Sequence, residues 1–67
     1  SHNVETMHHG EEVAYVVKGR ITVYVNDVPY ELEEGDSVLI PPESLHRWKN
    51  DGDEECDVLF AITPPSF

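Results

Sequence analysis

Two histidines and two acidic residues stand together near the start of the chain, in the stretch His8-His9-Gly10-Glu11-Glu12. In an extended strand successive side chains point to opposite faces, so His8 and Glu12 share one face while His9 and Glu11 share the other. An imidazole and a carboxylate on one face, followed by the apolar run Val13–Val17, suit two ligands of a metal inside a small barrel. The pattern therefore predicts part of a metal site that needs a third ligand from elsewhere.

The chain is short, with 67 residues and one cysteine, Cys56. We expect a single domain over residues 1–67. In a core of this size the free energy gained by burying apolar side chains roughly balances the entropy lost when the chain becomes ordered. A lone cysteine excludes an internal disulfide, so a metal or association with another chain has to supply further stability. We expect a homodimer, and Cys56 as a small buried core residue. The unpaired cysteine, with no signal peptide and no membrane-spanning apolar run, favours a cytoplasmic location.

The chain is strongly acidic, with 14 Asp and Glu residues against four Lys and Arg residues and a formal net charge of −10. Such a charge repels phosphate backbones and anionic membrane surfaces. We therefore expect no direct nucleic-acid contact and no membrane binding from this segment. The acids are interleaved with apolar residues, which indicates solvated strand faces and turns instead of a disordered tail.

The elements that must position the histidine and the carboxylate read as short strands. Runs of alternating or continuous apolar residues are separated by turn residues, and no stretch has helical periodicity over three turns. Asn26-Asp27 tolerates positive φ and predicts a tight hairpin, and Pro29 belongs on a sheet edge. This pattern predicts an all-β jelly-roll sandwich or barrel. The expected strands are Val13–Val17, Ile21–Val25, Val28–Leu32, Ser37–Ile40, Leu45–Lys49 and Cys56–Ile62.

The block GDSVLIPPESLHRWKN resembles the second conserved motif of the cupin superfamily. Gly35, Pro41, His46 and Asn50 fall on that motif in register, and Glu43 stands where glycine is usual. This resemblance implies a small cupin barrel, a double-stranded β-helix or jelly roll, that lacks the usual N-terminal strands.

The stretch from residue 6 to residue 19 is similar to the first cupin motif. His8, Glu12 and Gly19 match it, and Thr6 stands where the first histidine would be. The resemblance implies a divalent metal, Fe, Mn, Ni or Zn, held by His8, Glu12 and His46 as a facial triad. Water, a substrate oxygen or His9 are alternatives for the remaining position. The histidines could instead be hydrogen-bonded pocket residues of a barrel without metal.

The tail Ala61–Phe67 and the single histidine before Glu12 also resemble the C-terminal cupin domain of helix-turn-helix transcriptional regulators. This likeness implies a small-molecule-binding domain that senses an effector in a bacterial regulator. Tyr24 and Trp48 are candidates for ligand binding, with core or interface packing as the alternative. A stand-alone metal-dependent enzyme of dioxygenase, isomerase or epimerase type is the rival hypothesis, and no catalytic residue is assigned. A third hypothesis is a structural or storage-like cupin whose barrel is packed shut by its own side chains.

Overall fold

The computed structural model describes residues 5–7, 9–50 and 52–63. These residues form strands and connecting turns without a helix, so the prediction of an all-β fold is confirmed, and no helix in them could cross a membrane. The strands are β1 (Glu11–Lys18), β2 (Arg20–Val25), β3 (Val28–Glu33), β4 (Ser37–Ile40), β5 (His46–Lys49) and β6 (Asp57–Thr63).

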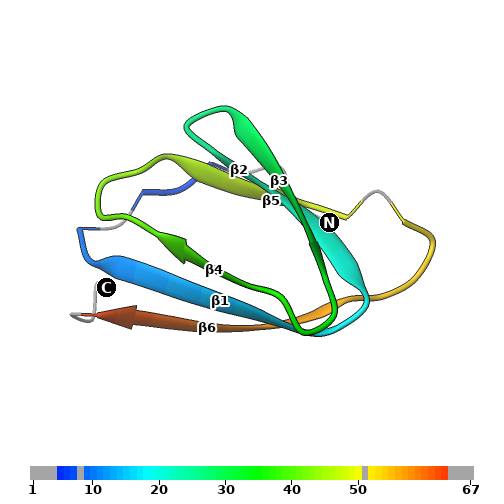
Figure 1. Ribbon diagram of the computed structural model, residues 1–67. Helices are drawn as coiled ribbons and strands as arrows, with labels where there is room; N and C mark the ends of the chain where they lie inside the picture. Colours follow the sequence, from blue (N-terminus) through cyan, green and yellow to red (C-terminus); the bar gives the residue numbers. More distant parts are fainter. Residues whose placement is uncertain (1–4, 8, 51, 64–67) are drawn as a thin grey trace.

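The strands form two antiparallel sheets of three strands each, in the orders β4-β1-β6 and β3-β2-β5. Figure 1 shows the two sheets as facing layers that diverge toward one side, in the manner of an open jelly-roll barrel. β1 is the central strand of the first sheet and β2 of the second, so a tight turn at Gly19 passes the chain from one layer to the other. Gly19 has φ of 80°, and a Cβ there would lie 2.7 Å from the carbonyl oxygen of Glu55.

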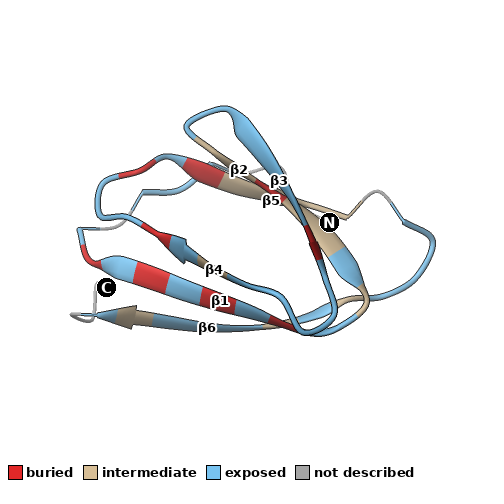
Figure 2. Ribbon diagram, viewed as in Figure 1, coloured by how far each residue is buried: buried red, intermediate tan, exposed pale blue. Residues whose placement is uncertain are grey.

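Burial alternates along β1, as Figure 2 shows. Glu12, Ala14 and Val16 are buried and face the interior, and the residues between them are exposed. Each fully buried aliphatic side chain contributes about 1.5–3 kcal/mol to stability. The core between the sheets consists of Val16, Val23, Leu32 and Ile40, with Ile21, Val25, Val38 and Trp48 packed against it.

The hairpin between β2 and β3 turns on Asn26 and Asp27, which have φ of 49° and 68°. Two consecutive residues with positive φ are the mark of a type I′ turn, whose twist matches that of the flanking strands. The predicted tight hairpin is therefore confirmed. Pro29 follows in β3, which is an edge strand, as its missing N–H requires.

Candidate functional site

The candidate site lies between the two sheets, at the end where β5 begins. Glu12 reaches it from the inner face of β1, and His46 from the inner face of β5. The two side chains are 4% and 2% exposed, and His46 Nε2 lies 3.2 Å from Glu12 Oε1. The two residues are far apart in the sequence, so the site depends on the two sheets being packed together.

Thr6 is a third residue beside this pair, in contact with His46. It forms an isolated antiparallel bridge with His46, in which each backbone N–H donates to the other's carbonyl at 2.8 and 2.9 Å. The Thr6 hydroxyl Oγ1 lies 3.1 Å from His46 Nε2. The position at which the first motif has a histidine therefore does contact the site, but it carries a hydroxyl.

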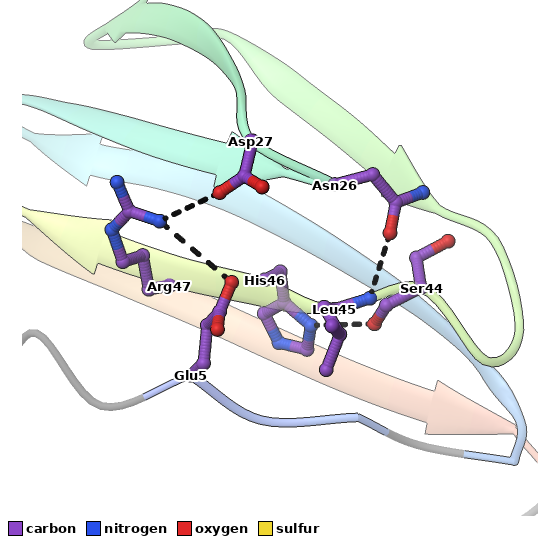
Figure 3. Close-up of polar contacts among 7 residues, drawn as sticks. All are labelled: Glu5, Asn26, Asp27, Ser44, Leu45, His46 and Arg47. Atoms are coloured by element: carbon purple, nitrogen blue, oxygen red, sulfur yellow. Dashed lines mark hydrogen bonds and ion pairs between the residues drawn. The ribbon is translucent and has the colours of Figure 1, made fainter.

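The backbone fixes which nitrogen of His46 faces the carboxylate. His46 Nδ1 lies 3.4 Å from the carbonyl oxygen of Ser44, which can only accept a hydrogen bond, so Nδ1 carries the proton of this long contact (Figure 3). Nε2 then faces Glu12 and Thr6. This arrangement resembles that of metal-binding histidines, whose second nitrogen commonly donates to a backbone carbonyl.

The position of His46 is set by hydrogen bonds on both sides of it in the sequence. The Asn26 backbone N–H donates to the Leu45 carbonyl at 2.7 Å, and the Leu45 N–H donates to Asn26 Oδ1 at 3.1 Å (Figure 3). Arg47 points to the other face of β5 and makes ion pairs with Asp27 at 3.3 Å and Glu5 at 3.7 Å. The β2–β3 turn thus holds the start of β5 in place and supports the imidazole.

The chemistry of the pair follows from burial and distance. A buried carboxylate is stable only when a positive charge or strong donors offset its lost hydration. His46 Nε2 lies 3.2 Å from Glu12 Oε1, and two arrangements would offset the charge of the carboxylate. Either the imidazole carries a second proton, or His46 Nε2 and Glu12 Oε1 bind one cation. The first state is an ion pair and the second is part of a metal centre.

The structure brings together two of the three predicted metal ligands, Glu12 and His46. His8 lies outside the described residues. Among the residues that the structure does describe, no group of three or more His, Cys, Asp or Glu side chains is arranged to hold a metal. His9 is exposed and lies 3.7 Å from exposed Glu43, away from the pair.

The two aromatic residues predicted to bind ligand lie on opposite faces of the second sheet. Trp48 is two residues after His46 on the inner face, packs against the core, and meets Phe60 of β6 edge to face at 5.3 Å. Tyr24 alternates with buried Val23 and therefore points outward, where the Arg47 guanidinium lies 4.1 Å from its ring centroid. Tyr24 does not contribute to the interior near His46.

Two surface hollows, of about 570 and 600 Å³, lie at the other end of the β2–β3 hairpin strands. Arg20, Glu33 and Gly52 line both. Neither is lined by Glu12 or His46, so the hollows are separate from the buried pair. No sequence motif predicts these hollows.

Residues 2–62 match the model of the Cupin_2 family, described as the cupin domain. The chain is 39% identical over 56 residues to "Protein SchB" of Streptomyces halstedii, covering 84% of this chain and 41% of SchB. It is 36% identical over 56 residues to "Polyketide synthase CurC" of Streptomyces cyaneus, covering 84% of this chain and 36% of CurC. It is 33% identical over 60 residues to the "HTH-type transcriptional regulator PuuR" of Escherichia coli, covering 90% of this chain and 32% of PuuR.

Solved structures have the same fold. An RmlC-like cupin from Shewanella frigidimarina superimposes with a TM-score of 0.70 at 29% identity, covering 87% of this chain and 50% of that one. The cupin domain of Schizosaccharomyces pombe Cnp3 superimposes with a TM-score of 0.76 at 20% identity, covering 87% of this chain and 42% of that one. The chain spans less than half the length of the three curated relatives named above.

Proposed function

Because this chain belongs to the cupin family, we propose that it is a small-molecule-binding barrel domain with a divalent-metal site built on Glu12 and His46. His8 is the third ligand of this proposal, on the basis of its place in the first motif. The single observation that carries the proposal is the buried contact of 3.2 Å between the Glu12 carboxylate and His46 Nε2.

The donor set fits a divalent metal. A carboxylate and an imidazole whose Nδ1 is engaged by the Ser44 carbonyl are ligands suited to Fe, Mn, Ni or Zn. When bound, such a metal acts as a Lewis acid toward an oxygen of the small molecule. Glu12 supplies negative charge, His46 supplies a neutral nitrogen, and the Thr6 hydroxyl offers a hydrogen bond beside them.

Metal titration tests this site. Chelator-treated protein is titrated with Mn²⁺, Fe²⁺, Ni²⁺ and Zn²⁺ by calorimetry, and bound metal is counted by elemental analysis. We expect one equivalent of at least one metal. Glu12→Gln should lower its affinity by more than about 100-fold, since removal of supporting residues alone costs 10–100-fold. Glu11→Gln, which changes the neighbouring acid on the exposed face of β1, should bind as the wild type does.

Equal affinity in Glu12→Gln and Glu11→Gln would overturn the metal site, as would wild-type protein that takes up no metal. Circular dichroism of both variants checks that they fold. In that outcome Glu12 and His46 are hydrogen-bonded pocket residues, and the domain has to bind its small molecule without a metal.

The proposed biological role is effector sensing within a cytoplasmic bacterial transcriptional regulator. Its support is the 33% identity to PuuR over 90% of this chain. The test is the reading frame around the segment: a helix-turn-helix domain before Ser1 is expected, and its absence would refute this role. The acidic domain itself should not retain DNA in a gel-shift assay.

A second candidate is a metal-dependent cupin enzyme, which the 36% identity to Polyketide synthase CurC favours. An enzyme should turn over a small polar metabolite in a metal-dependent way, and Glu12→Gln should remove the turnover. A sensor should bind its effector stoichiometrically and leave it unchanged. Mass spectrometry of a metabolite mixture incubated with the protein distinguishes the two outcomes.

A further inference from the structure

The Glu12–His46 pair is closed off from solvent. The two side chains are 4% and 2% exposed, and neither of the two surface hollows is lined by them. Under the proposed function a cation and a small molecule have to reach His46 Nε2, so part of the structure has to move aside. Local openings of this kind occur first where few contacts hold a segment in place.

Residues 5–7 cross from one sheet to the other beside this pair. They precede β1, which belongs to the first sheet, yet Thr6 forms its bridge with His46 of the second sheet. The described chain therefore begins beside β5 and then passes across to β1 (Figure 1). All three residues of this segment, which we call the strap, are exposed.

The strap is attached to the first two residues of β5. Its two backbone hydrogen bonds, of 2.8 and 2.9 Å, both join Thr6 to His46. The Thr6 hydroxyl lies 3.1 Å from His46 Nε2, and the Glu5 carboxylate lies 3.7 Å from the Arg47 guanidinium. The other side of β5 pairs with β2 over the whole strand, His46–Lys49. The strap is thus the less firmly attached neighbour of β5, and its hydroxyl occupies one approach to His46 Nε2.

We infer that the strap detaches from β5 to admit ligands to His46 Nε2 and then pairs with β5 again. This inference rests on the proposed function for what enters, whereas the opening itself is a property of the metal-free chain. Detachment breaks the bridge between Thr6 and His46 and leaves the pairing of β5 with β2 intact. It is a local opening, which requires less free energy than unfolding of the whole chain.

Acylation of His46 by diethyl pyrocarbonate measures this opening, because the reagent needs an accessible, unprotonated ring nitrogen. His46 is the one histidine between Arg20 and Arg47, so mass spectrometry of tryptic peptides reports its modification separately. Exposed His9 is the reference. Thr6→Pro removes a backbone donor and the hydroxyl, and should raise the rate at His46 relative to His9 about tenfold. An unchanged rate in a variant that is folded by circular dichroism would overturn the inference.

Glu5→Gln and Asp27→Asn form a matched pair of variants. Each removes one carboxylate partner of Arg47, but only Glu5 lies on the strap. Glu5→Gln should raise the rate of His46 acylation about twofold, as expected for an exposed ion pair. Asp27→Asn should leave the rate unchanged, since asparagine tolerates the positive φ of 68° at this position. Equal rates in the two variants would contradict the strap as the route to His46.

Amide hydrogen exchange of the metal-free chain, followed by NMR, shows whether the opening is local. The His46 N–H donates to Thr6, and in Thr6→Pro its exchange should accelerate by the same factor as acylation. The Asn26 N–H, which donates to Leu45 on the β2 side of β5, should not change. If the wild-type His46 amide has the same protection factor as the Val16 amide, the strap opens only with global unfolding, and the inference is wrong.

Uptake of Zn²⁺ separates this inference from the proposed metal site. Stopped-flow mixing with a zinc-sensitive dye should show faster uptake in Thr6→Pro than in the wild type, by a factor similar to that of acylation. Uptake at the wild-type rate, in a variant whose His46 is acylated faster, would exclude the strap as the entry route. If the wild type binds no metal, the metal site is refuted, and acylation and amide exchange still decide whether the strap opens.

Discussion

At one end of the interior Glu12 and His46 face each other across the two sheets, whereas four residues further along β1 the same inner face holds Val16, clustered with Val23. β5 shows the same change, from His46 to Trp48, whose ring meets Phe60. Both regions lie between the same pair of sheets. They differ in whether the buried side chains are polar.

The difference separates the groups that stabilise the fold from the two residues of the proposed metal site. Apolar side chains gain free energy on leaving water, while a buried ion pair often contributes less than an apolar pair of the same volume. A chain of 67 residues has a total stability of only about 3–10 kcal/mol. A buried polar pair in so small a domain therefore adds little to stability, which agrees with the proposed metal site at Glu12 and His46.

The largest effect is expected at the apolar end. Leu32→Ala should lower the free energy of unfolding by about 3 kcal/mol, because it leaves a cavity where Leu32 is 8% exposed. Urea denaturation followed by circular dichroism measures this loss. Leu45→Ala, at a residue that is 45% exposed, is the control and should stay within about 0.5 kcal/mol of the wild type. Similar losses in the two variants would contradict the position of the core.

Replacing the polar pair by apolar residues should raise the free energy of unfolding, whereas Leu32→Ala lowers it. The double variant Glu12→Leu with His46→Leu is expected to be more stable than metal-free wild type by about 1–2 kcal/mol, since a buried pair is replaced by side chains of similar volume. It should bind no metal. Urea midpoints in the presence of chelator measure the change. A double variant that is less stable by a similar amount would mean that the pair is structural.

The residues on the inner face of this polar end can be predicted from sequence, but the contact between Thr6 and His46 cannot. Period-two alternation correctly places Glu12 inside, and His9 and Glu11 outside. The same alternation in Ile21, Val23 and Val25 already contained the signal that Tyr24 points outward. The bridge from Thr6 to His46 spans 40 residues and depends on how the sheets pack, which no local pattern encodes.

The contact between the Ser44 carbonyl and His46 Nδ1 cannot be predicted from sequence, for a related reason. Any residue has a carbonyl, so its identity carries no signal, and only the backbone path before β5 directs it toward His46 Nδ1. The strands and turns were foreseen because hydrophobic period and turn residues are local properties. The way the two sheets pack against each other is a long-range property, and this packing brings Glu12 and His46 together.

A smaller effect is expected from completing the site at Thr6. Thr6→His places an imidazole where the hydroxyl now lies 3.1 Å from His46 Nε2. Metal affinity should rise at least tenfold, or about 1.4 kcal/mol, as measured by competition with a chelator. Thr6→Asn is the control, because it adds a polar side chain without a ring nitrogen. Equal affinity in the two variants would indicate that Glu12 and His46 are not metal ligands.

The smallest effect concerns the loop that leads into the polar end. Glu43 has φ of 62°, a left-handed conformation that costs an L-residue about 1–2 kcal/mol and explains why glycine is usual at this place in the motif. Glu43→Gly should raise stability by about 0.5–1 kcal/mol, since part of the relief is offset by the greater freedom of glycine in the unfolded chain. Its exposed contact with His9 at 3.7 Å contributes little. Gly35→Ala, at φ of 91° with open space around its Cβ position, should destabilise through backbone conformation alone. If Glu43→Gly lowers stability instead, His9 and Glu43 support the loop, and the polar end relies on surface charge as well as on its buried pair.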